Sequence, residues 1–320
     1  MDRELALEMV RVTEKAALSS ARWIGKGEKN RADEAAVMAM RSLFDTVAMK
    51  GEVVIGEGEM DLAPMLYIGE SVGNGEGPEV DVAVDPLEGT ELVAKGLDQA
   101  LAVVAIAPKG RLLHAPDMYM EKLAVGPNLA GRLSLADRPE DTMRKAAEII
   151  GKPLSDLTVS LLERDRHEQL LLALRKIGVR IKLLPAGDVA GAIAPAFSES
   201  GVDLYIGSGG APEGVLAAAA LRCLGGELQG RLMPETKDQY DRCLAMGIRD
   251  PRQILYNTDL AGTDDVIFAA TGITGGDFLG GVRFLPNEQA ETHSLVMRAK
   301  TKTVRFIRSL HTLSLEAVSA

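Results

Sequence analysis

Residues 157–226 repeat one pattern three times: a short apolar segment is followed by a longer segment with helical spacing of its apolar residues. The segments LTVSLLE, VRIKLLPAG and VDLYIGSGG are predicted strands, and the predicted helices begin near residues 166, 188 and 212. Parallel strands need a crossover between them, and a helix is the usual crossover. The second half of the chain therefore predicts a parallel sheet covered by helices, which places the protein in the α/β class.

The first half combines helices and strands in another order. Apolar residues at helical spacing predict helices over about 3–22 and 33–49. Strands are expected in GEVVIGEGEMD, VDVAVDP, LAVVAIAP and KLAVGP, with Gly110 marking a hairpin, and the tail after residue 264 is again rich in predicted strands. We place a boundary near residue 150, which divides the chain into two packed subdomains of layered α and β elements, 1–150 and 151–320.

The overall charge limits the kinds of ligand. A formal net charge of -10 and a pI near 5.1 exclude a general attraction to nucleic acid or to an anionic membrane, so an anionic ligand needs a local site. Cys223 and Cys243 are the only cysteines and lack paired spacing, which predicts core residues in a reducing compartment and excludes a zinc site built from cysteines. The N-terminal segment alternates charged and apolar residues, so it predicts neither a signal peptide nor a membrane anchor. Together these features predict a cytoplasmic protein.

The segment VDVAVDPLEGTELVAKG at 80–96 ends an apolar strand with two carboxylates and a hydroxyl. Pro86 removes a backbone donor, so Asp85 is expected where the strand ends, and ligand sites form at such sheet ends. Glu88 follows, and Thr90 then opens a short helix whose free N–H groups favour phosphate. From these residues alone, a purely structural interpretation with Thr90 as a helix N-cap remains open.

Further carboxylates lie at comparable positions. Glu57 follows the predicted strand VVI, and Asp33 and Glu213 each lie in the first turn of a predicted helix, where the helix dipole alone would explain them. If these positions converge with Asp85 and Glu88, the carboxylates repel one another unless cations neutralise them. Oxygen ligands suit Mg²⁺ or Mn²⁺, and paired ions of this kind activate water in phosphoester hydrolysis. The hypothesis is a site for two or more divalent ions.

The hexapeptide DPLEGT at 85–90 resembles the DPxDGT signature of the lithium-sensitive, inositol-monophosphatase-like phosphatases, with Glu88 in place of the second Asp. Together with five other segments in order, it resembles class II fructose-1,6-bisphosphatase, the GlpX family, from about residue 2 to about residue 311. The other segments are GKGEKN(x)2D at 25–33, VIGEGE at 54–59, APMLYIGE at 63–70, APDMYMEKL at 115–123 and GGAPEG at 209–214.

This resemblance implies a sugar-phosphatase fold and hydrolysis of the 1-phosphate of fructose 1,6-bisphosphate by metal-activated water, giving fructose 6-phosphate and phosphate. It also implies Mg²⁺ or Mn²⁺ as cofactor, a role in gluconeogenesis, and a dimer or tetramer. The matching metal-binding acids are Asp33, Glu57, Asp85, Glu88 and Glu213. The matching substrate-binding positions are Glu88, Gly89, Thr90, Tyr119, Arg164, Asp165, Arg166, Ala186, Gly187, Asp188 and Gly210. The matching catalytic positions are Thr90, Asp61 and Lys29. On this basis 1–150 is expected to bind metal and 151–320 to bind substrate.

Two departures from the family pattern concern the substrate side. The chain has Ala186 where the family's turn usually begins with Asp, and Asp165 where the segment before Arg166 usually has Pro. The first removes a sugar-hydroxyl or backbone-positioning contact. The second weakens anion binding unless Asp165 points away or orders a neighbouring arginine.

Three other functions remain open at this point. The first is a dual fructose-1,6- and sedoheptulose-1,7-bisphosphatase, the second an inositol-phosphatase-like monoesterase, and the third a non-catalytic ligand sensor, since strand and helix alternation also builds binding modules. Covalent catalysis by Ser208 is disfavoured, because it lies in GSGG without a Gly-x-Ser-x-Gly elbow and no histidine partner is evident. The histidines have no ligand spacing and are expected to be ordinary surface or core residues: His114, His167, His293 and His311.

Overall fold

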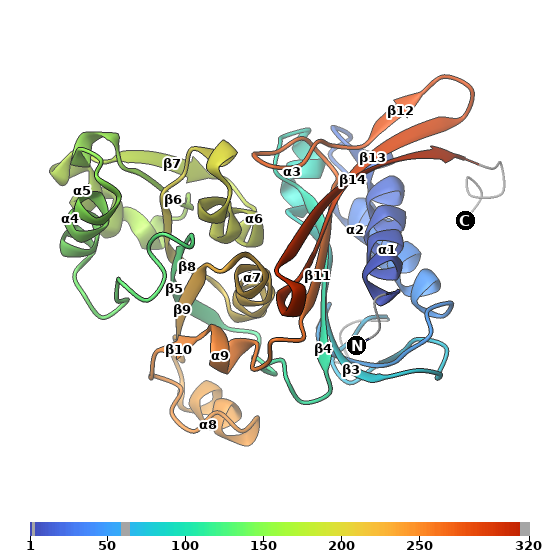
Figure 1. Cartoon of the computed structure of the whole chain (residues 1–320), viewed down its shortest axis with the longest axis horizontal. Coiled ribbons are helices and arrows are strands. Elements are labelled where there is room, and N and C mark those ends of the chain that lie inside the picture. The colour runs from blue at the N-terminus through green and yellow to red at the C-terminus, as the bar shows by residue number, and fades with distance from the viewer. Residues whose placement is uncertain (2–3, 59–64, 314–320) are drawn as a thin grey trace.

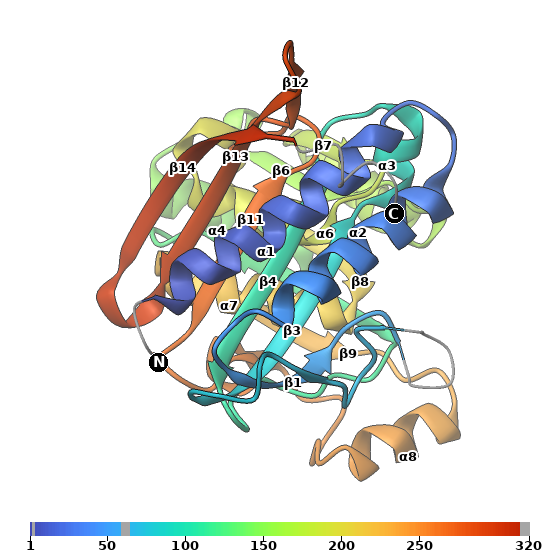
Figure 2. The same ribbon diagram turned by 90° about the vertical axis from the view of Figure 1, so that its right-hand side faces the viewer.

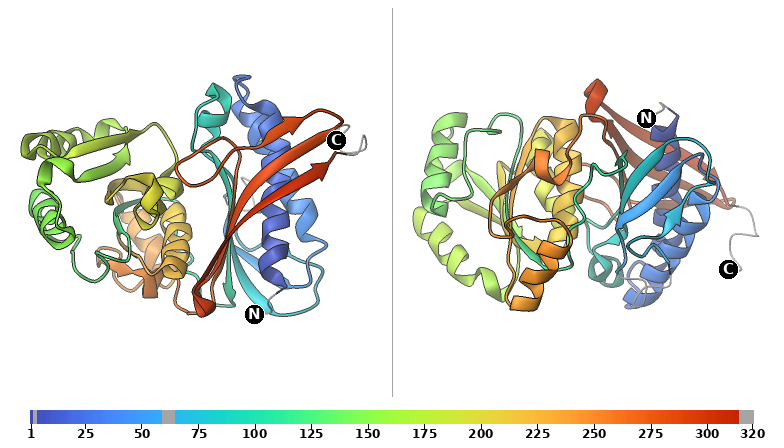
Figure 3. Two further views of the ribbon diagram at one scale, coloured as in Figure 1. Left: turned by 45° about the horizontal axis from the view of Figure 1, so that its top comes forward. Right: turned by 90° about the horizontal axis from the view of Figure 1, so that it is seen from below.

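The chain folds into alternating layers of helices and sheets (Figure 1). The structure, a computed structural model, describes residue 1 and residues 4–58 and 65–313. Within these residues the strands form an eight-stranded sheet and a six-stranded sheet, which we call the first and second sheets. Figures 1 and 3 show the order of the layers as α4 and α5, the second sheet, α6 and α7, the first sheet, and α1 and α2. The predicted layered α/β architecture is confirmed.

The first sheet runs in the order β12-β13-β11-β4-β3-β1-β2, and β14 pairs with β13. Its strands are β1 (Lys50–Ile55), β2 (Ser71–Val72), β3 (Glu79–Glu88), β4 (Leu101–Pro108), β11 (Ile267–Gly272), β12 (Arg283–Leu285), β13 (Gln289–Arg298) and β14 (Thr303–Thr312). The β1 and β3 strands are parallel, and the other pairs are antiparallel. The outer face is covered by α1 (Leu5–Ser20), close to the predicted helix, and by α2 (Lys29–Phe44). The α2 helix begins before its predicted start, so the expectation that Asp33 lies in its first turn is wrong. Figure 2 shows both helices lying across the sheet.

The second sheet runs in the order β10-β9-β5-β8-β6-β7. Its strands are β5 (Tyr119–Val125), β6 (Thr158–Leu162), β7 (Arg180–Leu184), β8 (Leu204–Gly210), β9 (Glu227–Leu232) and β10 (Leu255–Tyr256). The remaining helices are α3 (Thr90–Lys95), α4 (Pro139–Ile150), α5 (Glu168–Ile177), α6 (Asp188–Ile193), α7 (Ala211–Leu224), α8 (Lys237–Ala245) and α9 (Asn257–Leu260). The predicted parallel arrangement is confirmed for β6 with β7 and β8, whereas β5 pairs antiparallel with both β8 and β9.

The central layer is explained by the sequence of α7. Its residues, APEGVLAAAALRCL, are apolar nearly all round the helix, and a helix of that kind must be buried on every side. It packs with α6 between the two sheets in one apolar core, while separate cores lie under α1 and α2 and under α4 and α5.

The strands do not divide between the sheets at residue 150. The β5 strand precedes that residue but pairs in the second sheet, and β11 to β14 follow it but pair in the first sheet. The expected hairpin at Gly110 is wrong, because β4 and β5 belong to different sheets. Instead the carboxylate of Asp81 accepts the backbone N–H groups of Gly110, Arg111 and Leu112 and fixes the turn after β4. The assignment of metal binding to 1–150 and substrate binding to 151–320 stays a prediction.

Hydropathy adds one finding. None of the helices in the described part of the chain has both the length and the apolar character needed to cross a bilayer.

Candidate active site

A β-bulge near the end of β3 positions the two acids of DPLEGT. Asp85 pairs with Val103 and Glu88 pairs with Leu101, so three steps along β3 match two steps along β4. In a regular strand, residues three apart point to opposite faces, and the extra residue of a bulge cancels that alternation. Asp85 and Glu88 therefore both line the same pocket. The expectation that the strand ends at Asp85 is wrong, since β3 continues to Glu88.

The turn that follows depends on a glycine. Gly89 has a φ of 92°, a left-handed conformation that side chains rarely adopt, and it lets α3 begin at Thr90 directly after the strand. Asp85 Oδ1 accepts the N–H of Leu87 at 3.1 Å, which holds the carboxylate at the bulge. The N-cap role left open for Thr90 is not seen, because Gly89 is the N-cap and Thr90 is the first helical residue.

A pocket of about 620 Å³ lies beside these residues and is lined from both sheets. Its acidic wall contains Asp33 from α2, Glu57 after β1, Asp85 and Glu88 from β3, and Glu213 from α7. The structure thus brings all five predicted metal-binding acids to one pocket. Among the described residues, however, no group of three or more His, Cys, Asp or Glu side chains is placed to hold an ion as it stands. The convergence predicted from sequence is present without a closed ligand set.

Burial makes these acids hard to ionise. It raises the pKa of the Glu57 carboxyl to about 7, with a further contribution from the negative charge of Asp33. It raises the pKa of Glu88 to about 8, to which Asp188 adds repulsion. The pKa values of Asp33 and Glu213 are also raised, mainly by burial, and that of Asp85 is raised by burial and by four neighbouring carboxylates.

Two carboxylate oxygens in this wall lack partners. Glu88 Oε2 and Glu213 Oε2 are buried and accept no hydrogen bond within the described structure. An unpaired buried carboxylate oxygen is costly unless it is protonated or faces a cation. A wall made of carboxylate oxygens, with two of them unpaired, fits a hard divalent cation such as Mg²⁺ or Mn²⁺.

Asp188, which lines the pocket, belongs to a buried ion pair that the sequence analysis missed. Lys122 is fully buried, and its Nζ donates to Asp188 Oδ2 at 2.5 Å. Tyr205 donates its hydroxyl to Asp188 Oδ1 at 2.6 Å, and Glu88 Oε1 accepts the N–H of Val189 at 3.1 Å. This network fixes Asp188 beside the acidic wall. A lysine inside the apolar β5 segment YMEKLAV was the available signal, because a charge in a central strand needs a buried partner.

The pocket lining also contains cations and an aromatic ring, Arg164, Arg166 and Tyr119, which we call the cationic wall. Arg164 donates to the carbonyl oxygens of Glu163 and Pro185, each at 2.7 Å, which ties the ends of β6 and β7 together. Arg166 lies over the ring of Tyr119, with 4.4 Å between the guanidinium carbon and the ring centroid. Three of the residues predicted to bind substrate, Arg164, Arg166 and Tyr119, line this part of the pocket.

Ser208 and His167 hold Arg166 in this position. Arg166 donates to Ser208 Oγ at 2.9 Å and to the Ser208 carbonyl oxygen at 2.7 Å. The expectation that Ser208 has no histidine partner is wrong, since its Oγ lies 3.0 Å from His167 Nε2. That nitrogen accepts the Ser208 N–H, and Nδ1 lies 2.7 Å from the Leu162 carbonyl oxygen, so the ring is neutral and both nitrogens are engaged. Burial correspondingly lowers the pKa of His167. The pair supports an arginine, and Ser208 does not line the pocket.

Two glycines let the pocket carboxylates approach the backbone. A Cβ atom on Gly209 would lie 1.8 Å from Asp188 Oδ2, and one on Gly210 would lie 1.9 Å from Glu213 Oε2. Neither glycine has a positive φ, so the requirement is one of space. Gly210 was predicted to contact substrate, and the structure shows that it makes room for Glu213.

The other predicted residues divide into three groups. Gly89, Thr90, Ala186, Gly187 and Asp188 line the pocket with those named above. Lys29, the first residue of α2, and Asp165, at the start of a short 3₁₀ helix, are exposed and do not line it. Asp61 lies outside the described residues. Asp117 and Glu91 line the pocket although the sequence analysis did not select them as site residues.

The chain is similar in sequence to known proteins over nearly its whole length. A sequence profile described as bacterial fructose-1,6-bisphosphatase, glpX-encoded, matches residues 3–311. Fructose-1,6-bisphosphatase 1 class 2 of Escherichia coli K12 is 48% identical and covers 98% of this chain and 96% of its own length. Fructose-1,6-bisphosphatase class 2 of Haemophilus influenzae is 45% identical over 98% of this chain and 97% of its own length.

Among solved structures, the extragenic suppressor protein SuhB of Bartonella henselae aligns with 61% of this chain and 74% of its own. The identity is 16% and the TM-score is 0.33, which is too low to support an inference.

Proposed function

The chain belongs to the bacterial, glpX-encoded family of class II fructose-1,6-bisphosphatases, and from that premise we propose how its acidic pocket hydrolyses the 1-phosphate of fructose 1,6-bisphosphate. The protein is a phosphoric monoester hydrolase that yields fructose 6-phosphate and phosphate, a reaction of gluconeogenesis. The observation that carries this activity is 48% identity over 98% of the chain.

The acidic wall is the proposed cation site. Its ligands are Asp33, Glu57, Asp85, Glu88 and Glu213. Support comes from the buried, unpaired oxygens of Glu88 and Glu213 and from the raised pKa values of the wall. A divalent cation, when bound, neutralises phosphoryl charge and makes a water molecule more acidic. Mg²⁺ and Mn²⁺ are both compatible with an all-carboxylate site.

The chain's own groups then position the ester and move the proton. Thr90 lies beside Glu88 at the start of α3, and we assign its hydroxyl to orienting the attacking water against the phosphorus atom. A neighbouring carboxylate of the acidic wall accepts the proton of that water, the bond between phosphorus and O1 of the sugar breaks, and O1 takes up a proton from solvent. Lys29 and Asp61 keep their proposed helper roles.

The cationic wall is the proposed binding site for the rest of the substrate. Arg164 and Arg166 carry the charge needed for the second phosphate, and Tyr119 offers a ring and a hydroxyl to the sugar. Asp165 is exposed and outside the pocket wall, which supports the idea that its charge does not oppose anion binding.

Ala186 favours a second substrate. Its methyl group stands where the family usually has a carboxylate, so the wall near Asp188 is less negative and less crowded. On this ground we propose sedoheptulose 1,7-bisphosphate as an additional substrate. We further propose a cytoplasmic location, with no nucleic acid or membrane as partner.

Phosphate release from a panel of sugar mono- and bisphosphates, measured with Mg²⁺, with Mn²⁺ and with a chelator, tests the function. We expect turnover of fructose 1,6-bisphosphate with either ion and none with the chelator. Binding of the sugar bisphosphate without release of phosphate would instead identify a sensor.

Thr90→Ala tests the hydroxyl. We expect kcat to fall roughly a hundredfold with little change in KM, because loss of a group that positions the nucleophile affects the transition state more than substrate binding. Steady-state kinetics measure both constants. An unchanged kcat would contradict the role of Thr90, and Thr90→Ser, which keeps the hydroxyl, is the matched control.

Gly210→Ala tests the space beside Glu213. A Cβ atom 1.9 Å from Glu213 Oε2 forces that carboxylate to move. We expect kcat to fall at least about tenfold, since a small displacement of a catalytic group is costly, while thermal stability changes little. Gly280→Ala is the control, because its added Cβ would have no neighbour closer than 3.5 Å. Equal activity of the two variants would contradict the idea that residue 210 must be glycine to leave space for Glu213.

A further inference from the structure

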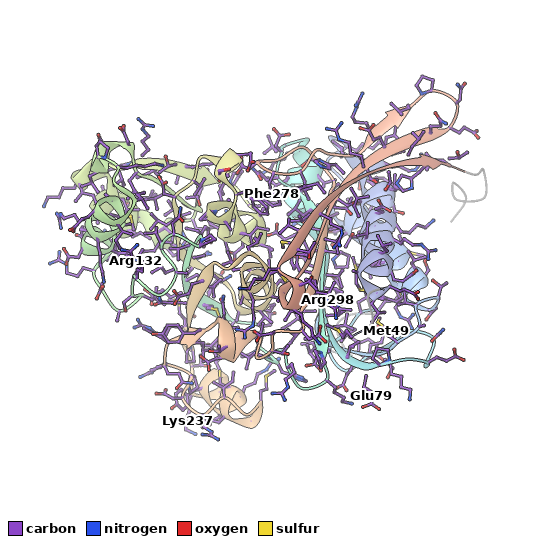
Figure 4. All side chains as sticks on the ribbon, viewed as in Figure 1. Met49, Glu79, Arg132, Lys237, Phe278 and Arg298 are labelled. Carbon is purple, nitrogen blue, oxygen red and sulfur yellow. The ribbon has the colours of Figure 1, made fainter. Side chains whose placement is uncertain are left out.

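One lysine lies inside the second sheet. Lys122 is in the middle of β5 and is fully buried, whereas Lys237, which Figure 4 labels on α8, is 87% exposed. A buried ammonium group is costly unless it is paired. Lys122 does not line the pocket, so it acts on the site through the groups around it.

The fold makes room for this side chain. Glycine lies opposite Lys122 on both neighbouring strands, Gly207 on β8 and Gly230 on β9. Residues opposite each other in a sheet point to the same face, so neither position adds a side chain beside the lysine stem. On α7, a Cβ atom added to Gly214 would lie 3.3 Å from Lys122 Cε. Glycines on three elements thus leave space for a long, unbranched side chain at this position.

The ammonium group of Lys122 reaches Asp188. Lys122 Nζ donates to Asp188 Oδ2 at 2.5 Å, and the Tyr205 hydroxyl donates to Oδ1 at 2.6 Å. A carboxylate has room for about four hydrogen bonds, so each oxygen of Asp188 can accept one more. Asp188 lines the pocket, whereas its two partners do not. The free acceptor positions are therefore available to a hydroxyl group of a ligand in the pocket.

Asp188 and Lys122 also act on two acids of the acidic wall. Burial raises the pKa of Glu88, and the charge of Asp188 raises it further. Burial raises the pKa of Glu213 as well, while the charge of Lys122 lowers it and that of Asp188 raises it. These are the two acids that each have a buried oxygen without a partner. Three neighbouring carboxylates offer the oxygen ligands that a hard cation prefers, and one of them is already neutralised by an ammonium group.

We propose that Lys122 is a positioning residue that reserves Asp188 for the sugar and keeps it from becoming a cation ligand. The inference rests on the proposed function, because it requires a divalent cation on the acidic wall and a sugar in the pocket. The ammonium group supplies, from the chain itself, the positive charge that a cation would otherwise supply beside Asp188. Without it, a negative Asp188 beside Glu88 and Glu213 attracts a further divalent cation.

Lys122→Met tests this role, because methionine keeps a long, unbranched stem and carries no charge. Titration of the cation-free protein with Mn²⁺, followed by the electron paramagnetic resonance signal of free Mn²⁺, counts bound ions without substrate. We expect one additional Mn²⁺ per chain in the variant. The KM for fructose 1,6-bisphosphate should rise about tenfold and kcat should change less than about threefold, because the added cation occupies oxygens that the sugar needs.

Two further variants serve as controls. Lys122→Met, Asp188→Asn removes both charges of the pair, and the Tyr205 hydroxyl can still donate to the new amide oxygen. Replacing both members of a buried ion pair is often neutral for stability, so we expect this variant to fold and to bind as many Mn²⁺ ions as the unmodified protein. Lys152→Met removes a lysine from an ion pair with Asp203, and neither of those residues lines the pocket. It should leave the Mn²⁺ count unchanged.

Thermal melting provides a readout that separates this role from simple packing. With a chelator, the melting temperature of Lys122→Met should fall by roughly 5 °C or more, and Mn²⁺ should restore most of that loss. A loss of the same size with and without Mn²⁺, or a variant that does not fold even with Mn²⁺, overturns the proposal. So does an unchanged Mn²⁺ count, or an additional ion in the double variant. If the unmodified protein binds Mn²⁺ and hydrolyses the substrate, these outcomes contradict the role of Lys122 alone, whereas an unmodified protein that binds no Mn²⁺ contradicts the proposed cation site and this inference with it.

Discussion

Replacing Asp85 by Asn is expected to lower kcat about a thousandfold and, at the same time, to raise the thermal stability of the cation-free protein. The carboxylate lies at the β3 bulge, among acids whose charges raise its pKa. Asn keeps the shape of the side chain and can still accept the Leu87 N–H, but it removes one ionisable group from the cluster. The same substitution therefore removes a proposed cation ligand and relieves repulsion.

Calorimetry with a chelator, combined with kinetics in Mg²⁺ and Mn²⁺, measures both effects. Asp141→Asn is the control, because Asp141 is exposed on α4 and paired with Arg144. We expect that variant to change neither quantity appreciably. A fully active Asp85→Asn enzyme would remove Asp85 from the proposed ligands. An inactive enzyme whose cation-free form is less stable would show that the carboxylate supports the fold in its charged form.

The second large effect concerns the dependence of stability on pH. The carboxyl of Glu57 has an ordinary pKa of 4.5 and a folded-state pKa of about 7, and Glu88 has a folded-state pKa of about 8. At a pH below the ordinary value both groups are protonated whether the chain is folded or unfolded. As the pH rises, the unfolded chain ionises first, which favours unfolding until the pH passes the folded-state values. For Glu57 alone this loss is of the order of 3 kcal/mol.

We therefore expect the melting temperature of the cation-free protein to fall by several degrees between about pH 5 and about pH 8. Divalent cations should restore more stability at the upper end of that range, because they bind the ionised carboxylates. Differential scanning fluorimetry with a chelator and with Mn²⁺ measures this difference. In the variant Glu57→Gln, Glu88→Gln the fall should be smaller but not abolished, because the pKa values of Asp33, Asp85 and Glu213 are also raised. A cation-free protein that gains stability over this range would contradict the proposed state of the acids.

Local sequence patterns predicted most of the helices and strands, but fewer of the strand pairings within the sheets. The repeat from residue 157 to residue 226 identifies β6, β7 and β8 with their helices, because periodicity is a local property. Nothing local indicates that β5 inserts between β8 and β9, or that β11 returns to β4. Those pairings depend on α7, whose apolar surface requires a sheet on each side. The predicted boundary near residue 150 follows a change in local pattern and not the strand pairing.

The acids of the pocket were predictable for a different reason. Asp85 and Glu88 interrupt an apolar strand, and charged groups at such a position need either solvent or a ligand. The bulge that turns both toward one pocket is set by pairing with β4 and has no local signature. Lys122 and Tyr205 were not selected from the sequence. Both act by hydrogen-bonding to Asp188, a buried partner that is distant in sequence. Asp165 lies outside the pocket lining, since adjacency to Arg166 in the sequence does not determine which way a side chain points.

The pairing of β11 with the edge of β4 also determines when the first sheet can finish folding during translation. The β4 strand ends at Pro108, and the strand that covers its edge begins at Ile267. A nascent chain on the ribosome must therefore expose an apolar edge while the whole second sheet is translated. We expect chaperones that shield unpaired strands to bind the emerging polypeptide in this interval, and ribosome-bound fragments ending before residue 267 to be aggregation-prone.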